Sequence, residues 1–276
     1  MGRAWPRPFG PASVKAGARP YHVAEDLLFR LGETEYATVD PRHTQPTPFG
    51  TFYAHPDFPD RHDANQLCRV SCAPAEVPEM LAELERCYAP LGFDFRKVSG
   101  CRPDVWAHLE GELTARGWKV WTCAMMLFSA EPIRNPSRSL DVRTVPPDSA
   151  DLESLFRTDG QLDRGFEFAR SQFQRMGGEY LVGYLDDRPA CCTGWFVQGR
   201  VARFRYVLTA PWARSQGCAT SLIRHVQRHA EVRAQDGLVI LVKEDGPLRL
   251  YHDLGFRVVG QVWEATWGDE SVDQGD

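Results

Sequence analysis

The sequence has no long apolar run, no excess of basic residues and very little lysine. No stretch approaches the roughly 18 consecutive apolar residues that a membrane-spanning helix needs, so we expect no membrane partner. The 32 lysine and arginine residues are outnumbered by 37 aspartate and glutamate residues, which gives a net charge of −5 and argues against a nucleic-acid binder. Nearly all of the positive charge is arginine, because lysine occurs only at four positions: Lys15, Lys97, Lys119 and Lys243.

The sequence also lacks a disulfide framework and a recognisable targeting signal. Its eight cysteines follow no framework spacing. The first residues, MGRAWP, place Pro6 where a myristoylation signal needs Ser or Thr, and no signal-peptide pattern is recognised. We therefore expect a cytoplasmic protein with reduced thiols.

Two of these cysteines, Cys68 and Cys72, lie close together in the strand-like stretch QLCRVSCA. A zinc site would need a second pair of Cys or His residues at finger spacing, and none follows. We favour buried apolar thiols over a zinc site, and we expect no metal.

Length and composition predict two domains. A chain of 276 residues exceeds the usual size of one domain, about 150 residues, and 43% apolar residues are enough to form ordinary cores. Residues 1–19 are rich in Gly, Pro and Arg and are typical of a tail, and residues 131–139 have the composition of a linker. The predicted division is a tail at 1–19, one domain at 20–133 and a second at 134–276.

The second domain alternates predicted strands and helices. A strand over residues 203–209 leads to a helix over 217–230, and a continuous apolar run over 238–242 follows, which is typical of a strand covered on both faces. Strand, helix and parallel strand form a βαβ unit. The predicted class is therefore α/β with a mixed sheet.

The junction between the first strand and the helix reads APWARSQGCATSLIRHV, residues 210–226. Pro211 ends the strand, because proline cannot donate to a sheet ladder. Gly217 permits a tight turn and the close approach of a ligand, and the free N–H groups of a helix start favour phosphate. With Arg214 as a charged donor, this predicts a phosphate-binding loop. The alternative is an ordinary turn whose small residues serve packing.

A second pattern strengthens the phosphate interpretation. The loop pattern P-x-x-R-x-x-G-x-A is followed, after the predicted buried strand, by L-Y-x-x-x-G-F within LYHDLGF. Together the two patterns resemble the GNAT-type N-acetyltransferases over residues 140–267. The resemblance implies the GNAT fold, acetyl-CoA as co-substrate and transfer of its acetyl group to an amine.

The resemblance also assigns roles to particular residues. The loop would bind the pyrophosphate of acetyl-CoA, the end of the preceding strand would bind the pantetheine arm and polarise the thioester carbonyl, and Tyr251 would protonate the departing thiolate. A buried structural tyrosine is the alternative for Tyr251. Asp245 stands where the family often has Asn, six residues before Tyr251, and is grouped with the CoA-binding residues. The remaining assigned residues are Arg214, Ser215, Gln216, Gly217, Cys218, Ala219 and Thr220 in the loop and helix start, and Val207, Leu208 and Thr209 in the strand.

No general base is evident in the motif region. Some relatives carry a glutamate where this chain has Ile240. Three other carboxylates are candidates, although each is more typical of a surface position: Glu167, Glu179 and Glu244. A water molecule can also remove the amine proton.

Arg203 and Arg205 are two residues apart on a strand, so both should point to one face, with Phe204 and Tyr206 on the other. One hypothesis is that this arginine face binds an acidic group of the acceptor. The alternative, which we favour slightly, is that both arginines pair with carboxylates such as Asp186 and Asp187 or face solvent.

The first half has a weaker pattern. LTARGWKVWTCAMM and YHDLGFRVVGQVW share a helix end, a glycine, an aromatic, a basic residue and a strand, which predicts a diverged GNAT-like repeat. Its strand-to-helix junction, VSCAPAEVPEM, has neither the arginine nor the glycine, so no phosphate site is expected there. An unrelated α/β domain is the alternative. The segment Thr47–Leu67 could form one wall of an acceptor pocket, although a solvated loop is favoured.

The predicted function is acyl-CoA-dependent N-acetylation of a primary amine on a small molecule or peptide. Two alternatives stay open: a catalytically silent CoA-binding or dimerisation module, and an aminoacyl or longer-chain acyltransferase on a related tandem fold. The sequence names neither the acceptor nor the oligomeric state, and a homodimer stays open.

Overall fold

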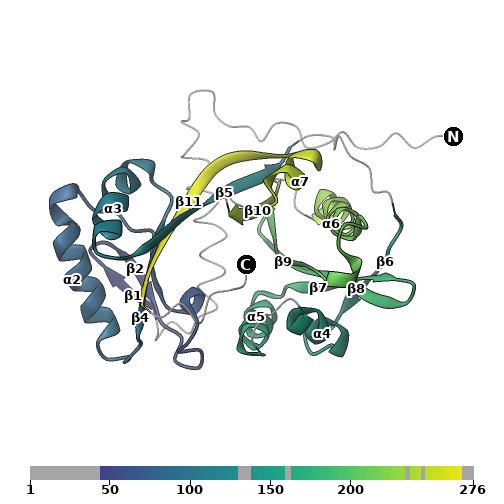
Figure 1. The fold of residues 1–276 in the computed structure, drawn as a ribbon, viewed down its shortest axis with the longest axis horizontal. Helices are drawn as coiled ribbons and strands as arrows, with labels where there is room; N and C mark the ends of the chain where they lie inside the picture. Colours follow the sequence, from purple (N-terminus) through teal and green to yellow (C-terminus); the bar gives the residue numbers. More distant parts are fainter. Residues whose placement is uncertain (1–43, 130–137, 159–162, 234–236, 244–245, 269–276) are drawn as a thin grey trace. The chain divides into compact units, whose positions relative to one another are not determined.

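The computed structural model describes residues 44–129, 138–158, 163–233, 237–243 and 246–268 (Figure 1). Within these ranges the protein has an eleven-stranded mixed sheet and six α-helices. The hydrogen-bonded order of the strands is β1-β2-β3-β4-β11-β5-β10-β9-β8-β7-β6. The mixed α/β class predicted from the sequence is confirmed.

The chain divides into two compact units. Of the described residues, unit 1 contains those within Met125–Val259, and unit 2 contains those within 44–124 and 260–268. Two strands, β5 (Lys119–Phe128) and β11 (Phe256–Gly268), are therefore each divided between the units. The predicted tail 1–19 and the predicted boundary after residue 133 fall outside the described residues, so the predicted domain division stays a prediction.

Unit 1 contains the predicted βαβ unit. Antiparallel pairs join β6 to β7, β7 to β8 and β8 to β9, and β9 pairs in parallel with β10. The β7–β8 turn is the Asp186-Asp187 pair, and both residues have positive φ angles, as a tight hairpin turn requires. The elements are β6 (Asp141–Val145), α4 (Ala150–Thr158), α5 (Asp163–Met176), β7 (Glu179–Leu185), β8 (Arg188–Gln198), β9 (Val201–Thr209), the 3₁₀ turn η4 (Pro211–Ala213), α6 (Cys218–Arg233), β10 (Gly237–Lys243) and α7 (Leu248–Asp253).

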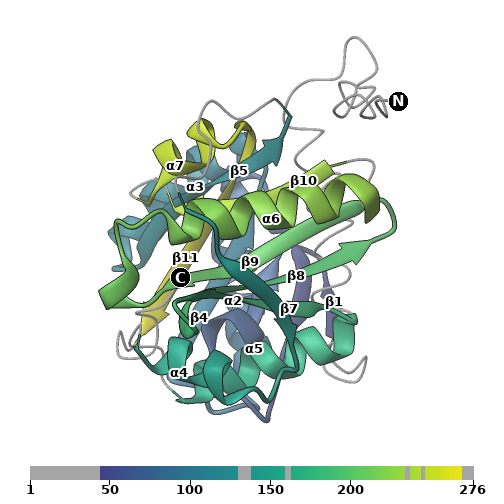
Figure 2. The same ribbon diagram turned by 90° about the vertical axis from the view of Figure 1, so that its right-hand side faces the viewer.

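Helices cover both faces of β7–β9. Figures 1 and 2 show α6 on one side of these strands and α4 and α5 on the other. Alternating residues of β8 show the same division: Trp195 packs near His229 of α6, with ring centroids 6.3 Å apart. Its neighbour Gly194 faces α5 instead, because a Cβ atom at Gly194 would lie 2.7 Å from the Phe173 ring.

Unit 2 has the same order of elements as unit 1 from β7 onward. Three antiparallel strands lead through a 3₁₀ turn to a helix, a parallel strand, a second helix and a last strand. This order supports the predicted GNAT-like repeat, which stays a prediction. The elements are β1 (Thr44–Thr47), β2 (Gly50–Tyr53), η2 (His62–Ala64), β3 (Gln66–Cys68), η3 (Pro74–Glu76), α2 (Val77–Tyr88), β4 (Phe95–Gly100), α3 (Pro103–Ala115) and the first part of β5.

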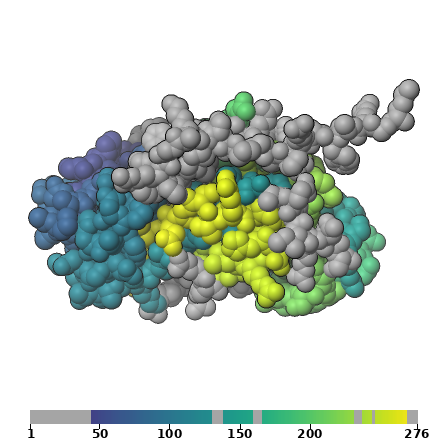
Figure 3. All heavy atoms as spheres, turned by 90° about the horizontal axis from the view of Figure 1, so that it is seen from above, coloured from purple at the N-terminus to yellow at the C-terminus, as the bar shows by residue number. Residues whose placement is uncertain are grey.

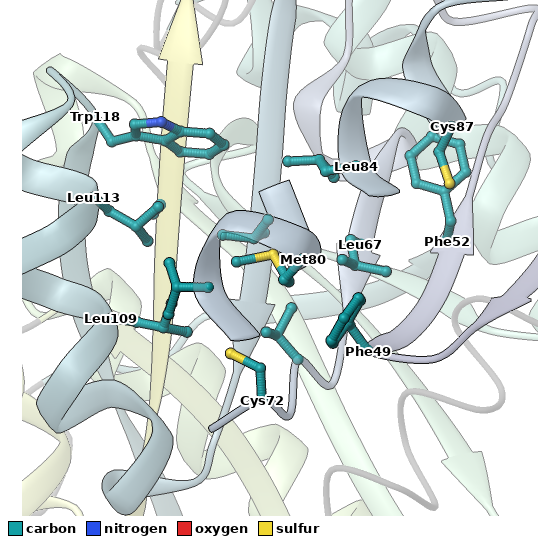
Figure 4. Close-up of a cluster of buried hydrophobic side chains, with 14 of the residues drawn as sticks. Phe49, Phe52, Leu67, Cys72, Met80, Leu84, Cys87, Leu109, Leu113 and Trp118 are labelled. Atoms are coloured by element: carbon teal, nitrogen blue, oxygen red, sulfur yellow. The ribbon is translucent and has the colours of Figure 1, made fainter. Parts of the chain in front are cut away.

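The core of unit 2 lies where α2 and α3 meet the sheet. Met80 and Leu84 of α2 face Leu109 and Leu113 of α3, and Leu67 contributes from β3 (Figure 4). All five side chains are at most 1% exposed. Positions 80 and 84, like 109 and 113, are one helical turn apart, which places both members of each pair on one face of the helix.

The segment Thr47–Leu67 is not the solvated loop that the sequence favoured. His55, Arg61 and His62 are all less than 9% exposed. Asn65, fully buried, holds the segment: its side chain accepts from the His55 N–H at 2.6 Å and donates to the carbonyls of Phe58 and Arg61, both at 2.8 Å. The solvated interpretation was wrong because one buried amide satisfies the backbone of the segment from within.

Seven of the eight cysteines are buried, and all eight are free thiols, as expected for apolar thiols. None of the helices that the structure describes has the length and apolar character needed to cross a membrane. Val258 and Trp267 are the large hydrophobic side chains that stay exposed among the described residues. Both belong to β11, which reaches the surface in yellow (Figure 3).

Candidate functional site

The predicted phosphate loop connects β9 to α6. β9 ends at Thr209, Pro211 begins η4, and α6 starts at Cys218. Between them Ser215 has φ +60° and Gly217 has φ +81°. Left-handed residues in a turn aim successive N–H groups toward one concave side, which is a common way for backbone to bind anions.

The N–H groups of this loop are available for a ligand. None of the N–H groups from Ser215 to Thr220 donates to another described residue, whereas the Ser221 N–H donates to the Gly217 carbonyl at 3.0 Å. The positive end of the α6 dipole lies at the same place. The sequence prediction thus corresponds to a row of unused donors, which gives the loop the capacity to bind phosphate oxygens.

The equivalent junction of unit 2 offers fewer available N–H groups, and in the described stretch between Val70 and Val77 it has no residue with a positive φ angle. Between β3 and α2 the N–H groups of Val70 and Ser71 donate to the carbonyls of Ser99 and Phe49, at 3.0 and 2.9 Å. The Ala73 N–H donates to the Glu76 carboxylate at 2.6 Å. Two prolines, Pro74 and Pro78, have no N–H to offer.

Side-chain contacts hold the loop of unit 1 in its conformation. Gln216 donates from its side-chain amide to the Trp212 carbonyl at 2.7 Å, and the Arg188 guanidinium stacks 4.1 Å from the Trp212 ring. Arg214 turns back and donates from Nε to the Thr209 carbonyl at 3.2 Å. The first turn of α6 is packed tightly, since Cys218 and Thr220 are both less than 9% exposed. Burial raises the pKa of the Cys218 thiol, so this thiol stays protonated.

β9 and β10 diverge toward the loop. Their parallel pairing covers Val201–Arg203 and Gly237–Val239, and no register pair follows among the described residues. The opposite edge of β9 continues to pair with β8 as far as Thr209. Val207, Leu208 and Thr209 therefore lie on an edge that β10 does not occupy, where peptide groups can bind an amide-bearing arm.

Tyr251 lies in α7 with its ring packed against aromatic side chains. The ring centroid is 6.2 Å from Phe204 and 5.8 Å from Phe256, and the residue is 4% exposed. Its hydroxyl makes no hydrogen bond to any residue in the described part of the chain. Burial raises the pKa of Tyr251 above its ordinary value, so the phenol keeps its proton at neutral pH.

The carboxylates considered from the sequence are not gathered at this site. Asp245 and Glu244 lie outside the described residues. Glu167 is exposed on α5, and Glu179 is half-buried at the start of β7. Ile240 is a buried residue of β10. The general base stays unassigned.

The arginine face of β9 follows the predicted alternation only in part. Arg203 pairs opposite Phe196 and Arg205 opposite Gly194, so both arginines face α5. Phe204, opposite Trp195, faces α6 as expected. The prediction was wrong for Tyr206, because the β8–β9 register shifts next to it and its φ is +57°. This β-bulge turns Tyr206 onto the α5 face together with Arg205.

Neither suggested carboxylate, Asp186 or Asp187, forms an ion pair with these arginines in the described structure. Asp187 lies 3.7 Å from Arg143. Arg205 instead donates to the Gln172 side-chain oxygen at 3.3 Å. Sequence reasoning missed Gln172, although a signal was present: it falls on the buried stripe of α5, four residues after Phe168 and three after Ala169.

Comparisons with known proteins agree with this fold. No family model matches the chain, and no curated protein matches its sequence. Among solved structures, a GCN5-related N-acetyltransferase from Kribbella flavida is similar with TM-score 0.64 and 18% identity, over 90% of this chain and 96% of that one. A GCN5-related N-acetyltransferase from Sphaerobacter thermophilus gives 0.57 and 13%, over 91% and 94%. A conserved protein of unknown function from Staphylococcus epidermidis gives 0.67 and 12%, over 82% and 93%.

Proposed function

Since this chain has the fold of the GCN5-related N-acetyltransferases, we propose that it transfers an acyl group, most simply acetyl, from an acyl-CoA to a primary amine of a small molecule or peptide. The proposal places one acyl-CoA on unit 1 and none on unit 2.

A single observation carries the proposal. The loop from Ser215 to Thr220 offers N–H groups that no described residue uses, at the start of a sixteen-residue helix. At the matching junction of unit 2 the N–H groups of Val70, Ser71, Ala73 and Glu76 are already bonded, and Pro74 and Pro78 have none. Two junctions at the same place in the order of elements thus differ in the property that a pyrophosphate needs.

The neighbouring residues fit the rest of the reaction. The edge at Val207–Thr209 would hold the amides of pantetheine and a donor for the thioester oxygen. A neutral amine would attack the thioester carbon, the carbon–sulfur bond would break, and the thiolate would take the proton of Tyr251. The phenol is protonated at neutral pH, as a general acid must be, while burial raises the pKa of Tyr251 and makes it a weaker acid than free tyrosine. The amine proton would leave to water.

The arrangement of β9 allows both partners to reach the thioester. Tyr251 contacts Phe204, which lies on the α6 face of the strand. The opposite face carries Arg205 and Tyr206. An acyl group held at the strand edge would therefore meet the proton donor from one side and the acceptor amine from the other.

Calorimetry with acetyl-CoA, followed by mass spectrometry of an amine panel, tests the proposal. We expect one acetyl-CoA per chain and acetylated product. Gly217→Trp should abolish binding, because its side chain would fill the phosphate position. Gly117→Trp is the matched control: Gly117 has nearly the same φ, +80°, lies in unit 2, and would place a Cβ in open space.

Three outcomes contradict the proposal, and a fourth refines it. Two acetyl-CoA molecules per chain would show that the chain has a second site, and unchanged affinity in Gly217→Trp would show that the loop is not the site. Binding without transfer to any amine would support the silent CoA-binding module instead. If longer acyl-CoAs are preferred over acetyl-CoA, the protein is still an acyltransferase, but the transferred group is a longer acyl chain.

A further inference from the structure

A row of three residues crosses unit 1 on the face covered by α5. Tyr180 of β7 pairs opposite Gly194 of β8, which pairs opposite Arg205 of β9. Gly194 has no side chain, and a Cβ there would lie 2.7 Å from the Phe173 ring and 3.0 Å from the Tyr180 ring. The absent side chain therefore lets Tyr180 and Phe173 lie over the middle strand, next to Arg205.

The bulge in β9 adds a fourth member to this row. The Thr193 hydroxyl donates to the Arg205 carbonyl at 2.8 Å, which fixes the strand where the register shifts. Tyr206 then packs its ring against Phe156 and Phe173, with centroids 5.5 and 5.9 Å away. Without the bulge Tyr206 would face α6. The bulge thus places a guanidinium and a phenol, adjacent in sequence, on the same face.

The side chains of Arg205 and Tyr206 both donate to one uncharged oxygen. The side-chain oxygen of Gln172, buried on α5, accepts from Arg205 at 3.3 Å and from the Tyr206 hydroxyl at 3.5 Å. A carboxylate is the stronger acceptor for both groups, because it pairs opposite charges with Arg205 in a bidentate geometry and gives the Tyr206 hydroxyl an ionised acceptor. The contacts around Gln172 are therefore ones that an anionic ligand would improve.

The Tyr180 hydroxyl is a buried donor on the same face. Tyr180 is 1% exposed, and its hydroxyl oxygen is buried without a hydrogen-bond partner in the described structure. Buried polar groups are nearly always bonded, so an exception needs an explanation. Burial raises the pKa of Tyr180, and Arg205 and Tyr206 both lie close enough to influence that pKa. A protonated, unbonded donor therefore lies beside the guanidinium.

Arg205 also lies close to the strand edge at which the thioester is proposed to bind. Arg205 precedes the strand edge Val207–Thr209 by two to four residues, which corresponds to roughly 7–13 Å along a strand. An acceptor whose amine reaches a thioester at that edge would extend its other end along the α5 face of β9.

We propose that Arg205, Tyr206 and Tyr180 form a subsite for a carboxylate on the acceptor, so that the preferred substrate is an amine that also carries an acid group. This inference rests on the proposed acyltransferase function and adds the substrate class. Gln172 would orient Arg205 and Tyr206, which makes it a positioning residue.

Matched acceptors test the subsite directly. We would compare glycine, 4-aminobutyrate and 6-aminohexanoate with their carboxamides, and ethanolamine with phosphoethanolamine, at saturating acetyl-CoA. The acid should be preferred over its amide in at least one pair, by about 10-fold or more in kcat/KM. In Arg205→Met this preference should disappear through a rise in acceptor KM of about 10- to 100-fold. Arg143→Met, which removes an exposed arginine of β6, is the control and should keep the preference.

Tyr180→Phe separates a binding role from a structural one. Since the hydroxyl has no partner in the described structure, its removal should leave thermal stability unchanged or raise it, yet it should raise the KM of the acid acceptor several-fold. A loss of stability with an unchanged acid preference would show that the hydroxyl serves the fold, and would overturn its place in the subsite.

The failures of the two proposals are distinguishable. If acetyl-CoA binds and amines are acetylated but no acid is preferred over its amide, the carboxylate subsite is wrong and the transferase proposal stands. If phosphoethanolamine is the preferred acceptor, the subsite binds phosphate and the carboxylate assignment is wrong. If acetyl-CoA does not bind, both proposals fall together.

Discussion

Replacing Tyr251 by phenylalanine isolates one hydroxyl group whose surroundings the structure defines well. The ring would keep its contacts with Phe204 and Phe256, and no hydrogen bond to a described residue would be lost. We therefore expect the free energy of unfolding to change by less than about 0.5 kcal/mol. Loss of a general acid lowers the rate by about 10² to 10⁴, which corresponds to about 3–5 kcal/mol at the transition state.

The assay combines denaturant unfolding, calorimetry with acetyl-CoA and the rate of thiol release from acetyl-CoA. Tyr251→Phe should unfold like the wild type, bind acetyl-CoA equally well and turn over far more slowly. The wild-type rate should show no loss of the Tyr251 acid below about pH 10, because the pKa of Tyr251 is raised above that of a free tyrosine.

A second tyrosine provides the opposite pattern as a control. The Tyr184 hydroxyl donates to the Asp151 carboxylate at 2.6 Å, so Tyr184→Phe should lose about 1–2 kcal/mol of stability and keep its turnover. If Tyr251→Phe behaves like Tyr184→Phe, with lower stability and a normal rate, Tyr251 is a structural residue and its assignment as the acid is refuted.

Two further predictions concern stability. Asn65→Ala should lower the free energy of unfolding by about 2–5 kcal/mol, because the His55 N–H and two carbonyls lose a buried partner. Urea titration measures this change, and a change below about 0.5 kcal/mol would contradict the role of Asn65. Burial lowers the pKa of His225 to about 4, whereas an unfolded histidine titrates near about 6.5. Between these two pH values the unfolded chain binds a proton that the folded chain does not bind. The free energy of unfolding should therefore fall from pH 6.5 toward pH 4. In His225→Gln the fall should be shallower, and an identical pH profile would show that other groups cause it.

The loop and its strand order could be predicted from the sequence because their signals are local. Pro211, Gly217 and Gly255 each fix a boundary through a backbone restriction that no distant contact overrides: a missing N–H at Pro211 and positive φ at both glycines. The apolar run of β10 likewise identifies a strand covered on both faces.

The α5 face could not be predicted, because it depends on registers between strands. Strict alternation along β9 would put Tyr206 on the other face of the sheet from Arg205. A single bulge brings both side chains to the same face. The position of Gln172 beside Arg205 follows from the packing of α5 on the sheet, which a single sequence does not encode locally. The same reason explains Asn65: nothing in PDRHDANQL distinguishes a polar residue that faces inward from one that faces water.

The division of β5 and β11 has a consequence for anyone who wishes to prepare half of this protein. Unit 1 includes Met125–Phe128, which belong to the first half of the sequence, and unit 2 includes Gly260–Gly268, which pair with β4 through Trp263 and its neighbours. A gene cut between the two halves would give each fragment a strand that belongs to the other unit and remove one of its own. Each fragment would then expose an unpaired strand edge, the feature through which sheets aggregate. Expressed together, the two fragments should instead reassociate by exchanging these strands, so co-expression followed by co-purification is the practical route to a split form.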